Sequence, residues 1–403
     1  MIKKADILER AAEWQLDAGV VEKDHVLGWL LAGIATHGAT RELWIFKGGT
    51  CLKKCILETY RFSEDLDFTL LPEAEYTAAR ITEILREISV RATEWSGIQF
   101  PASEIVVRPR VDKLGRETFE GRMGYTGPMA VPGPPKIRFD LTKHEPLVQA
   151  PRRRPVLHPY PDSLPPDALV STYSFSELLA EKLRALCERA LPRDLYDVIR
   201  LADLELTVPE RSEIRDVVRE KFEAKAMAVP TIAEIVTLVS SSAEMRSEWE
   251  NMLAHQLPAL PILDEHLARL PAAIAWLEER APAVTGLVPI GGGASETLVI
   301  ERGMRMWGAG VPIEAIRFAG SNHLLVEFLY NRRRRVVEPY SLRRPKTGNL
   351  LLYGFEREKD GAHTDDIRAY KVREISNVRI LQQAFTPRYT VEFTERGDGW
   401  RSS

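Results

Sequence analysis

The chain has 403 residues, of which 44% are hydrophobic and 28% are charged, and its formal net charge is −3. Such a composition is typical of a globular protein of two or three domains and excludes a peptide or a single small module. No window approaches the roughly 18 uninterrupted apolar residues of a membrane helix, and the charged start of the chain lacks the apolar core of a signal peptide. We therefore expect a cytoplasmic protein that has no membrane partner.

Cysteine and histidine spacing argues against disulfides and against a recognisable zinc motif. The three cysteines, Cys51, Cys55 and Cys187, are an odd number and form no CxxC pair. The eight histidines never fall at zinc-finger or HExxH spacing. The cysteines are therefore interpreted as buried apolar residues.

The first part of the chain alternates between helical and strand patterns. Apolar residues at helical spacing predict two helices within the first forty residues. A run of β-branched and aromatic residues at 43–46 is stopped by Gly48 and Gly49, which predicts a strand, a tight turn and then a helix. Two further strands, at about 65–71 and 136–141, and an intervening helix at about 81–88 are expected.

The second part divides into a helical region and a region rich in strands. Seven prolines between residues 145 and 167 predict an extended connection. Ser174 and Glu177 have capping-box spacing and open a block of helical patterning that continues to about residue 280. A glycine-rich linker follows, and beyond it runs at about 324–330, 350–355, 367–372 and 388–393 predict a small β-barrel or sheet. The expected segments are a core at 1–170, a helical domain at 171–282, a linker at 283–295 and a β-domain at 296–403.

The most informative stretch combines a glycine pair at a helix start with two aspartates in the next strand. Gly48, Gly49 and Thr50 place backbone N–H groups at a helix N-terminus, where the helix dipole favours a phosphate. Asp65 and Asp67 stand two apart in a strand, so both carboxylates project from one face. Close negative charges of this kind suit Mg²⁺, which also binds triphosphates. Together these features predict a pocket for a nucleoside triphosphate and Mg²⁺.

A third carboxylate, Asp140, is a candidate ligand of the same metal. It lies in an apolar strand pattern, where burial of an unpaired charge is costly, so a metal or a cationic partner is expected. The alternative is that these acids lie at exposed strand ends or pair with arginines. The order of the motifs, from the strand and glycine pair to the two aspartates of the next strand, favours the functional interpretation.

A second group of candidate residues lies in the helical region. Lys182 is a candidate for neutralising triphosphate charge. Asp194 and Asp197 are three apart on one helix face, so either is a candidate for orienting this lysine or for acting as a base toward an attacking hydroxyl. The same residues also fit an ordinary salt bridge between two helices.

Positive charge is concentrated in the C-terminal part. From residue 300 onward there are 19 Lys and Arg residues against 13 Asp and Glu residues, a net charge of +6, which leaves −9 for the rest of the chain. Two runs of basic residues are candidates for contact with nucleic acid: Arg332, Arg333, Arg334, Arg335, Arg343 and Arg344. The alternative is that these arginines are merely solvated.

Four motifs follow one another between about residues 15 and 205. They are Val21-Glu-Lys-Asp24, Phe46-Lys-Gly-Gly-Thr50, Arg61-Phe-Ser-Glu-Asp-Leu-Asp-Phe68, and Glu181-Lys182 with Arg193-Asp-Leu-Tyr-Asp197. Together they resemble the AbiEii/AbiGii-type nucleotidyltransferase toxins of bacterial toxin–antitoxin and phage-abortive systems. The resemblance implies an α/β (α+β) fold with a polymerase-β-like nucleotidyltransferase core and a helical domain that completes its cleft. It also implies nucleotide transfer from a triphosphate to RNA, with the tRNA 3′ end as expected acceptor, a block of translation, and an antitoxin protein as partner.

Carried over by position, the resemblance assigns a role to each candidate residue. Asp65, Asp67 and Asp140 would hold Mg²⁺, Lys47, Gly48, Gly49 and Thr50 would bind the triphosphate, and Lys182 with Asp194 or Asp197 would complete the catalytic site.

The C-terminal region has a resemblance of its own. The runs 337–342, 350–356 and 368–375 resemble a WYL domain, a small SH3-like barrel that regulates prokaryotic defence proteins by sensing nucleic acid or nucleotide ligands. The name-giving Trp-Tyr-Leu is replaced here by Leu350-Leu-Leu352.

The leading hypothesis from the sequence is therefore a Mg²⁺-dependent nucleotidyltransferase toxin that modifies RNA. A nucleotide or nucleic-acid sensor that uses the C-terminal domain is an alternative of a different class. An enzyme that nucleotidylates a protein hydroxyl is a third possibility, because only the acceptor would differ.

Overall fold

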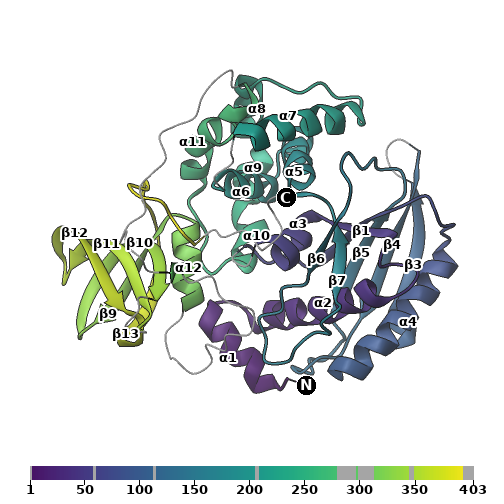
Figure 1. The fold of residues 1–403 in the computed structure, drawn as a ribbon, viewed down its shortest axis with the longest axis horizontal. Helices are drawn as coiled ribbons and strands as arrows, with labels where there is room; N and C mark the ends of the chain where they lie inside the picture. Colours follow the sequence, from purple (N-terminus) through teal and green to yellow (C-terminus); the bar gives the residue numbers. More distant parts are fainter. Residues whose placement is uncertain are drawn as a thin grey trace.

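A computed structural model describes residues 2–57, 60–111, 115–204, 208–278, 296–297, 313–344 and 349–393. Figure 1 shows a large sheet with flanking helices, a group of helices above it, and a smaller sheet on the opposite side of the molecule. The expected linker at 283–295 lies outside the described residues, as does the side chain of Arg344. Within the described ranges, no helix is long and apolar enough to cross a membrane.

The large sheet has seven strands in the order β3, β4, β5, β2, β1, β7, β6. In chain order these are β1 (Trp44–Lys47), β2 (Asp65–Leu70), β3 (Ile105–Val111), β4 (Glu117–Gly124), β5 (Lys136–Thr142), β6 (Arg152–Pro155) and β7 (Leu169–Thr172). The pairs β2–β5 and β1–β7 are parallel, whereas the other neighbouring strands are antiparallel. This mixed sheet confirms the expected α/β class and the strands predicted at β1, β2 and β5.

Alternation along β2 and β5 separates the core from the candidate site. Leu66 and Phe68 of β2 and Phe139 of β5 are buried on one face of the sheet. Two long helices, α2 (Ala18–Thr36) and α4 (Ala78–Ser96), pack against each other in the same apolar core (Figure 1). Because side chains alternate along a strand, Asp65 and Asp67 must lie on the opposite face, away from this core.

The helical region follows β7. Its helices are α5 (Phe175–Arg189), α6 (Pro192–Ala202), α7 (Val208–Glu223), α8 (Ile232–Ser241), α9 (Ala243–Ser247), α10 (Trp249–Leu253) and α11 (Leu263–Ala273). The hydroxyl of Ser174 accepts a hydrogen bond from the Glu177 N–H at 3.0 Å, which confirms the predicted cap of α5. The prediction of helices from Ser174 to about residue 280 is therefore confirmed where the structure describes this part.

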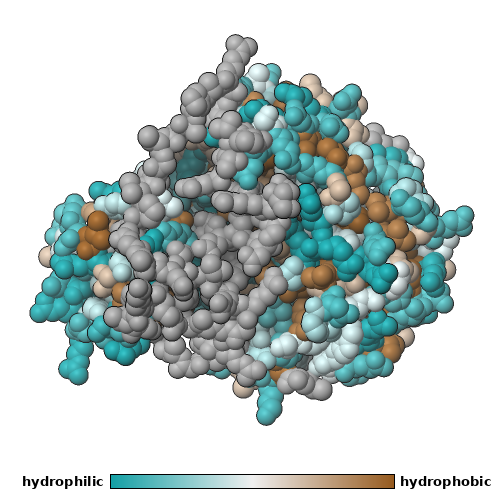
Figure 2. All heavy atoms as spheres, in the orientation of Figure 1, coloured by the Kyte–Doolittle hydropathy of each residue, from teal (hydrophilic) through white to brown (hydrophobic). Residues whose placement is uncertain are grey.

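The C-terminal region contains an open antiparallel sheet. Its described elements are β8 (Glu296–Thr297), α12 (Ile313–Ser321), β9 (Leu324–Tyr330), β10 (Arg333–Arg344), β11 (Leu351–Lys359), β12 (Ala362–Lys371) and β13 (Ile375–Ala384). The order is β12, β11, β10, β9, β13, and β8 pairs with β10. In the part of the chain that the structure describes, β12 and β13 do not pair, so the predicted closed SH3-like barrel is not confirmed. The surface of this sheet in Figure 2 is mostly hydrophilic.

One predicted strand of the C-terminal region is wrong. Residues 388–393 form bends, an isolated bridge at Thr390 and a turn, and the last strand of the sheet is β13, which was not predicted. The aromatic and β-branched side chains of this segment, including Tyr389 and Val391, pack against Tyr340 and Phe355 of the smaller sheet. Their alternation therefore reflects packing of single side chains and not pairing of a strand.

The C-terminal end of α12 and the residue after it connect the smaller sheet to the rest of the protein. The Tyr196 hydroxyl of α6 donates a hydrogen bond to Asn322 Oδ1 at 2.8 Å. Arg200 of the same helix donates to the backbone carbonyl of Ser321. The Gln15 amide, after α1 (Lys4–Trp14), donates to the Val378 carbonyl at 3.2 Å. Helix α6 is thus held by the C-terminal region on the side of Tyr196 and Arg200.

Lys53, a buried lysine just after the glycine pair, should affect the stability of the protein. Its ammonium group is buried over the rings of Trp14 and Phe62, and burial lowers its pKa to about 8. Since the unfolded state then holds the proton more tightly, the free energy of unfolding should rise as the pH increases from about 8 to about 10. Lys53→Met should stabilise the protein by about 1–3 kcal/mol at pH 7 and remove this rise. Urea unfolding of both proteins across that pH range measures the difference, and an identical pH slope in the two would contradict it.

Candidate active site

Three carboxylates lie next to one another on the face of the large sheet opposite the core. Asp67 in β2 is the direct register partner of Asp140 in β5, and Asp65 precedes Asp67 by two residues on the same face. Asp65 and Asp67 are half-buried, whereas Asp140 is exposed. We call Asp65, Asp67 and Asp140 the carboxylate cluster.

The carboxylate cluster concentrates negative charge. Burial and the neighbouring Asp140 raise the pKa of Asp67 to about 6, although Lys47 acts in the opposite direction. Partial shielding from water by the surrounding protein also raises the pKa of Asp140, although its side chain remains exposed. A divalent cation would offset this repulsion, and carboxylate oxygens from two adjacent strands are donors that Mg²⁺ accepts. The chemistry of these donors therefore suits a magnesium ion, whose binding by the three acids stays a prediction.

The glycine pair is packed directly against this cluster. Gly48 opens α3 (Gly48–Cys51) with a φ of +78°, and a Cβ there would come within 2.1 Å of Asp67 Oδ2, so only glycine fits. A Cβ on Gly49 would come within 2.7 Å of Arg61 Nη2. The Thr50 hydroxyl donates to the Asp65 carbonyl at 2.5 Å. The turn predicted to bind phosphate is thus in contact with the carboxylates predicted to bind metal.

Lys47 is held in a buried ion pair beside the cluster. Its ammonium group donates to Thr142 Oγ1 at 3.0 Å and pairs with Glu145. Burial alone would lower the pKa of Lys47, but Glu145 and Glu181 hold it above its usual value. The proposed contact of Lys47 with a triphosphate stays a prediction. Glu145 had no signal in the sequence, because it lies in a loop and reaches Lys47 only through the fold.

Asp197 joins two cations on the helical side of the site. Arg61 donates to both carboxylate oxygens of Asp197, at 2.6 and 2.8 Å, and Lys182 Nζ lies 2.7 Å from Oδ2. Burial would raise the pKa of Asp197, but Arg61 and Lys182 hold it well below its usual range. An ionised carboxylate whose oxygens are occupied by two cations is a weak base, so this geometry favours an orienting role.

Asp194, the other candidate on α6, has a different partner. Its two oxygens accept hydrogen bonds from Arg189 at 2.6 and 2.8 Å. Lys182 is therefore in contact with Asp197 and not with Asp194. The charge of Lys182 also lowers the pKa of Asp67, although burial and Asp140 raise it overall. The catalytic roles of Lys182, Asp194 and Asp197 stay predictions.

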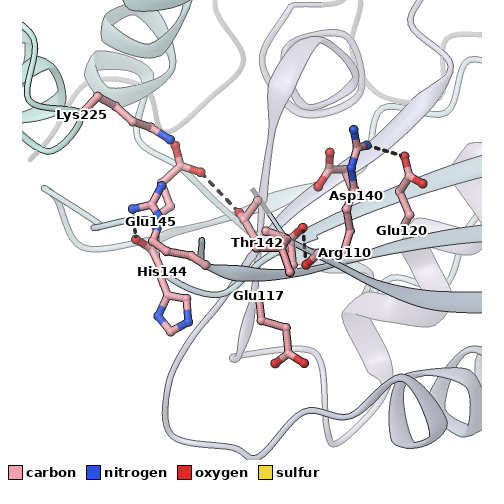
Figure 3. Close-up of a pocket in the computed structure, with 11 residues that line it drawn as sticks. Arg110, Glu117, Glu120, Asp140, Thr142, His144, Glu145 and Lys225 are labelled. Atoms are coloured by element: carbon pink, nitrogen blue, oxygen red, sulfur yellow. Dashed lines mark hydrogen bonds and ion pairs between the residues drawn. The ribbon is translucent and has the colours of Figure 1, made fainter. Parts of the chain in front are cut away.

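A cavity of about 300 Å³ opens beside Asp140 (Figure 3). Its walls come from β3, β4, the end of β5 with the loop that follows, and the turn after α7, and they include Arg110, Arg116, Glu117, Glu120, Thr142, His144, Glu145 and Lys225. In Figure 3 the side chain of Lys225 extends from the helical side toward Glu145. Arg110 is paired with Glu120 at 2.8 Å. The cavity thus adjoins the carboxylate cluster and carries cationic groups on both walls.

The arginine runs of the C-terminal region are largely paired with carboxylates. Asn331 and Arg332, both with positive φ, form the two-residue turn between β9 and β10. The remaining described pairs are Arg333 with Asp360 at 3.9 Å, Arg334 with Glu327 at 2.6 Å and Glu358 at 3.2 Å, Arg335 with Glu356 at 3.1 Å, and Arg343 with Glu392. Arg335 and Arg343 are buried. Contact of these arginines with nucleic acid stays a prediction, and their pairing leaves less free positive charge than the sequence suggests.

Known proteins match most of the region of the large sheet and of the helical region. Residues 29–277 match the family model described as nucleotidyl transferase AbiEii toxin, type IV toxin–antitoxin system. Among solved structures the chain is similar to MenT4, a nucleotidyltransferase toxin from Mycobacterium tuberculosis. The sequence identity is 22% and the TM-score 0.47, over 70% of this chain and 91% of the other. No curated protein matches the chain.

Proposed function

Because the chain belongs to the AbiEii family of nucleotidyl transferase toxins, we propose that it transfers a nucleotide from a nucleoside triphosphate to RNA. The acceptor that we propose is the 3′ end of tRNA, whose modification blocks translation. The observation that carries this proposal is the contact of the Gly48 turn with Asp67, directly beside Asp140. The toxin–antitoxin family also supports a cognate antitoxin protein as a partner.

The residues of the site have different roles in the proposed reaction. The carboxylate cluster would hold Mg²⁺, which when bound neutralises phosphate charge and favours in-line attack on the α-phosphate. Backbone N–H groups at Gly49 and Thr50 bind the departing phosphates at the start of α3. Lys182, oriented by Asp197, offsets negative charge next to Asp67.

The sheet topology supports an assignment of the two sides of the site. The attacking and leaving oxygens lie on opposite sides of a phosphorus atom during in-line transfer. The Gly48 turn follows β1, on one side of β2, whereas the cavity lies over β5, β4 and β3 on the other side. The triphosphate tail therefore belongs at the Gly48 turn and the acceptor at the cavity. Arg116 and Lys225 on its walls suit the phosphate backbone of an RNA acceptor.

Lys225→Glu tests this assignment of the cavity. Reversal of the charge should raise the KM for acceptor RNA about 10-fold, because one phosphate contact is replaced by repulsion. The KM for the triphosphate should not change. Lys136→Glu, an exposed lysine of β5 outside the cavity lining, is the matched control. If Lys225→Glu raises the KM for the triphosphate alone, the assignment of the two sides is wrong.

The experiment that tests the proposed function is label transfer. Purified protein is incubated with each radiolabelled triphosphate in turn and total bacterial RNA, with Mg²⁺ or with a chelator, and the products are separated on denaturing RNA and protein gels. We expect label in a tRNA-sized band, and only with Mg²⁺. Label on protein would identify a polypeptide acceptor, and no label from folded protein would favour the sensor alternative.

We further propose that residues 296–403 are a regulatory WYL-like domain. The support is the six-stranded antiparallel sheet and its connection, through Asn322 and Ser321, to Tyr196 and Arg200 of α6. The same helix carries Asp197, which pairs with Lys182. A shift of the C-terminal region that moves α6 would therefore change the orientation of Lys182. Asn322→Ala should therefore change kcat without changing the site residues themselves.

A further inference from the structure

A second group of metal-binding side chains lies outside the candidate active site, where α2 meets the segment that follows β6. His25 comes from α2, and His158 and Asp162 come from this segment. One ligand atom from each residue lies within 4.8 Å of the other two. The three side chains are 1%, 4% and 9% exposed, respectively. The group is therefore a buried set of two imidazoles and one carboxylate.

The distances within this group fit ligands of one small ion. His25 Nε2 lies 2.9 and 3.2 Å from the two oxygens of Asp162, and His158 Nε2 lies 3.2 Å from Oδ1. Ligand atoms bound tetrahedrally at roughly 2.0–2.2 Å from one ion stand about 3.3–3.6 Å apart. Both imidazoles thus present the same nitrogen to the same carboxylate at the spacing of a coordination shell.

The hydrogen bonds around this group leave His25 Nε2 available to a metal. His25 Nε2 lies 2.9 Å from Asp162 Oδ2, and the Trp29 indole nitrogen lies 3.1 Å from the same His25 atom. A neutral imidazole nitrogen carries either a proton or a lone pair, so it cannot donate to Asp162 and accept from Trp29 together. With the lone pair on a metal, Trp29 donates instead to Asp162 Oδ2, which is 3.3 Å away. Such an outer hydrogen bond is the usual support of a metal-bound carboxylate.

Helix α2 has a glycine, Gly28, at the place where the His158 ring packs against it. A Cβ on Gly28 would come within 2.4 Å of His158 Nδ1, so glycine is required where the His158 ring meets α2. Glycine within a helix costs roughly 1 kcal/mol relative to alanine. The Nδ1 atoms of His25 and His158 are buried without a hydrogen-bond partner, so both rings are oriented through Nε2. Gly28 thus makes α2 less stable but leaves room for the His158 ring beside Asp162.

We propose that His25, His158 and Asp162 form a structural site for a divalent transition metal, with Zn²⁺ as the ion and water in the fourth position. Two imidazoles and one carboxylate suit Zn²⁺ and similar ions, whereas Mg²⁺ prefers oxygen ligands alone. The ion would tie the segment after β6 to α2. Asp24, next to His25 on that helix, pairs with Lys54 at 2.8 Å, so the tie supports the helix that follows the glycine pair. This site is separate from the carboxylate cluster and does not depend on the proposed reaction.

Metal binding to the full-length protein tests the proposal directly. Chelator-treated, desalted protein is titrated with Co²⁺ while visible d–d absorption and tryptophan fluorescence are recorded. We expect one Co²⁺ per chain, quenched fluorescence because Trp29 adjoins His25, displacement by Zn²⁺, and no displacement by Mg²⁺. Zn²⁺ in excess should raise Tm by roughly 5 °C. No absorption band, or displacement by Mg²⁺, would overturn the proposal.

Three variants locate the bound ion. His158→Ala and Asp162→Asn should each weaken Co²⁺ binding at least about 10-fold. His363→Ala removes an exposed imidazole of β12 and should bind as the wild type does. Circular dichroism checks that each variant is folded, and Asp162→Asn, which keeps the shape of the side chain, decides the question if His158→Ala does not fold. Equal Co²⁺ binding by Asp162→Asn and the wild type would show that the ion lies elsewhere.

Discussion

Replacing Asp67 by asparagine is expected to lower nucleotide transfer on the order of 10³-fold while the protein remains folded. Asp67 contacts the Gly48 turn and faces Asp140, so it stands where the proposed phosphate and metal sites meet. Asparagine keeps the size of the side chain but removes the negative charge that holds a cation. Label transfer under saturating triphosphate and Mg²⁺ measures the loss as a fall in kcat.

The same substitution should stabilise the protein when no metal is present. Burial and Asp140 disfavour the charge on Asp67, so its removal relieves repulsion within the carboxylate cluster. Thermal unfolding in a chelator should therefore give a higher Tm for Asp67→Asn than for the wild type. Glu83→Gln makes the same change on the exposed surface of α4 and serves as the control for both measurements. A soluble Asp67→Asn protein with full transfer activity would rule out the carboxylate cluster as the reactive site.

The carboxylate cluster was predictable because its geometry is local. Two aspartates spaced by two in a strand share a face whatever the rest of the fold does, and the glycine pair marks the helix that opens beside them. The register that sets Asp140 opposite Asp67 is not local, and the sequence indicated only that an acid in the apolar pattern of β5 needs a metal or a cationic partner. The sequence therefore predicted the three acids that the fold brings together.

The groups that hold the site together could not be predicted in this way. Arg61 contacts Asp197 across 136 residues, and Lys47 contacts Glu145 across 98. Neither partner follows from spacing, because the first contact depends on how the helical region packs on the sheet and the second on how the loop after β5 returns to β1. His25 and Asp162 are likewise 137 residues apart, beyond the reach of any zinc-motif rule based on spacing.

In the arginine run of the C-terminal region, the sequence suggests more free positive charge than the structure shows. Four adjacent arginines indicate a basic patch when only the sequence is considered. In the sheet, alternation and register set two of them against acids of neighbouring strands, as with Arg334 beside Glu327 and Arg335 beside Glu356. Charge counted along the chain therefore overstates the charge that a nucleic acid would meet.

Asp197→Asn is expected to impair both stability and activity. The substitution leaves the buried Arg61 without its ionic partner, and loss of one partner from a buried pair costs about 3–5 kcal/mol. Lys182 also loses the contact that holds it near Asp67, and Arg61 loses the contact that fixes it against Gly49. Misplacement of such groups by about 1 Å lowers kcat by roughly 10²-fold. Urea unfolding and label transfer per folded molecule measure the two effects separately.

Asp194→Asn is the matched control, because it also removes a buried aspartate that binds an arginine through both oxygens. Its partner Arg189 is 54% exposed, so water can replace the lost contact and the stability loss should be smaller, about 1–2 kcal/mol. Transfer activity per folded molecule should stay near that of the wild type. If Asp194→Asn were the variant that lost activity, Asp194 would be the acid that serves the reaction. A double-mutant cycle of Asp197→Asn with Lys182→Met then isolates their coupling, which should be large only if Asp197 acts by orienting Lys182.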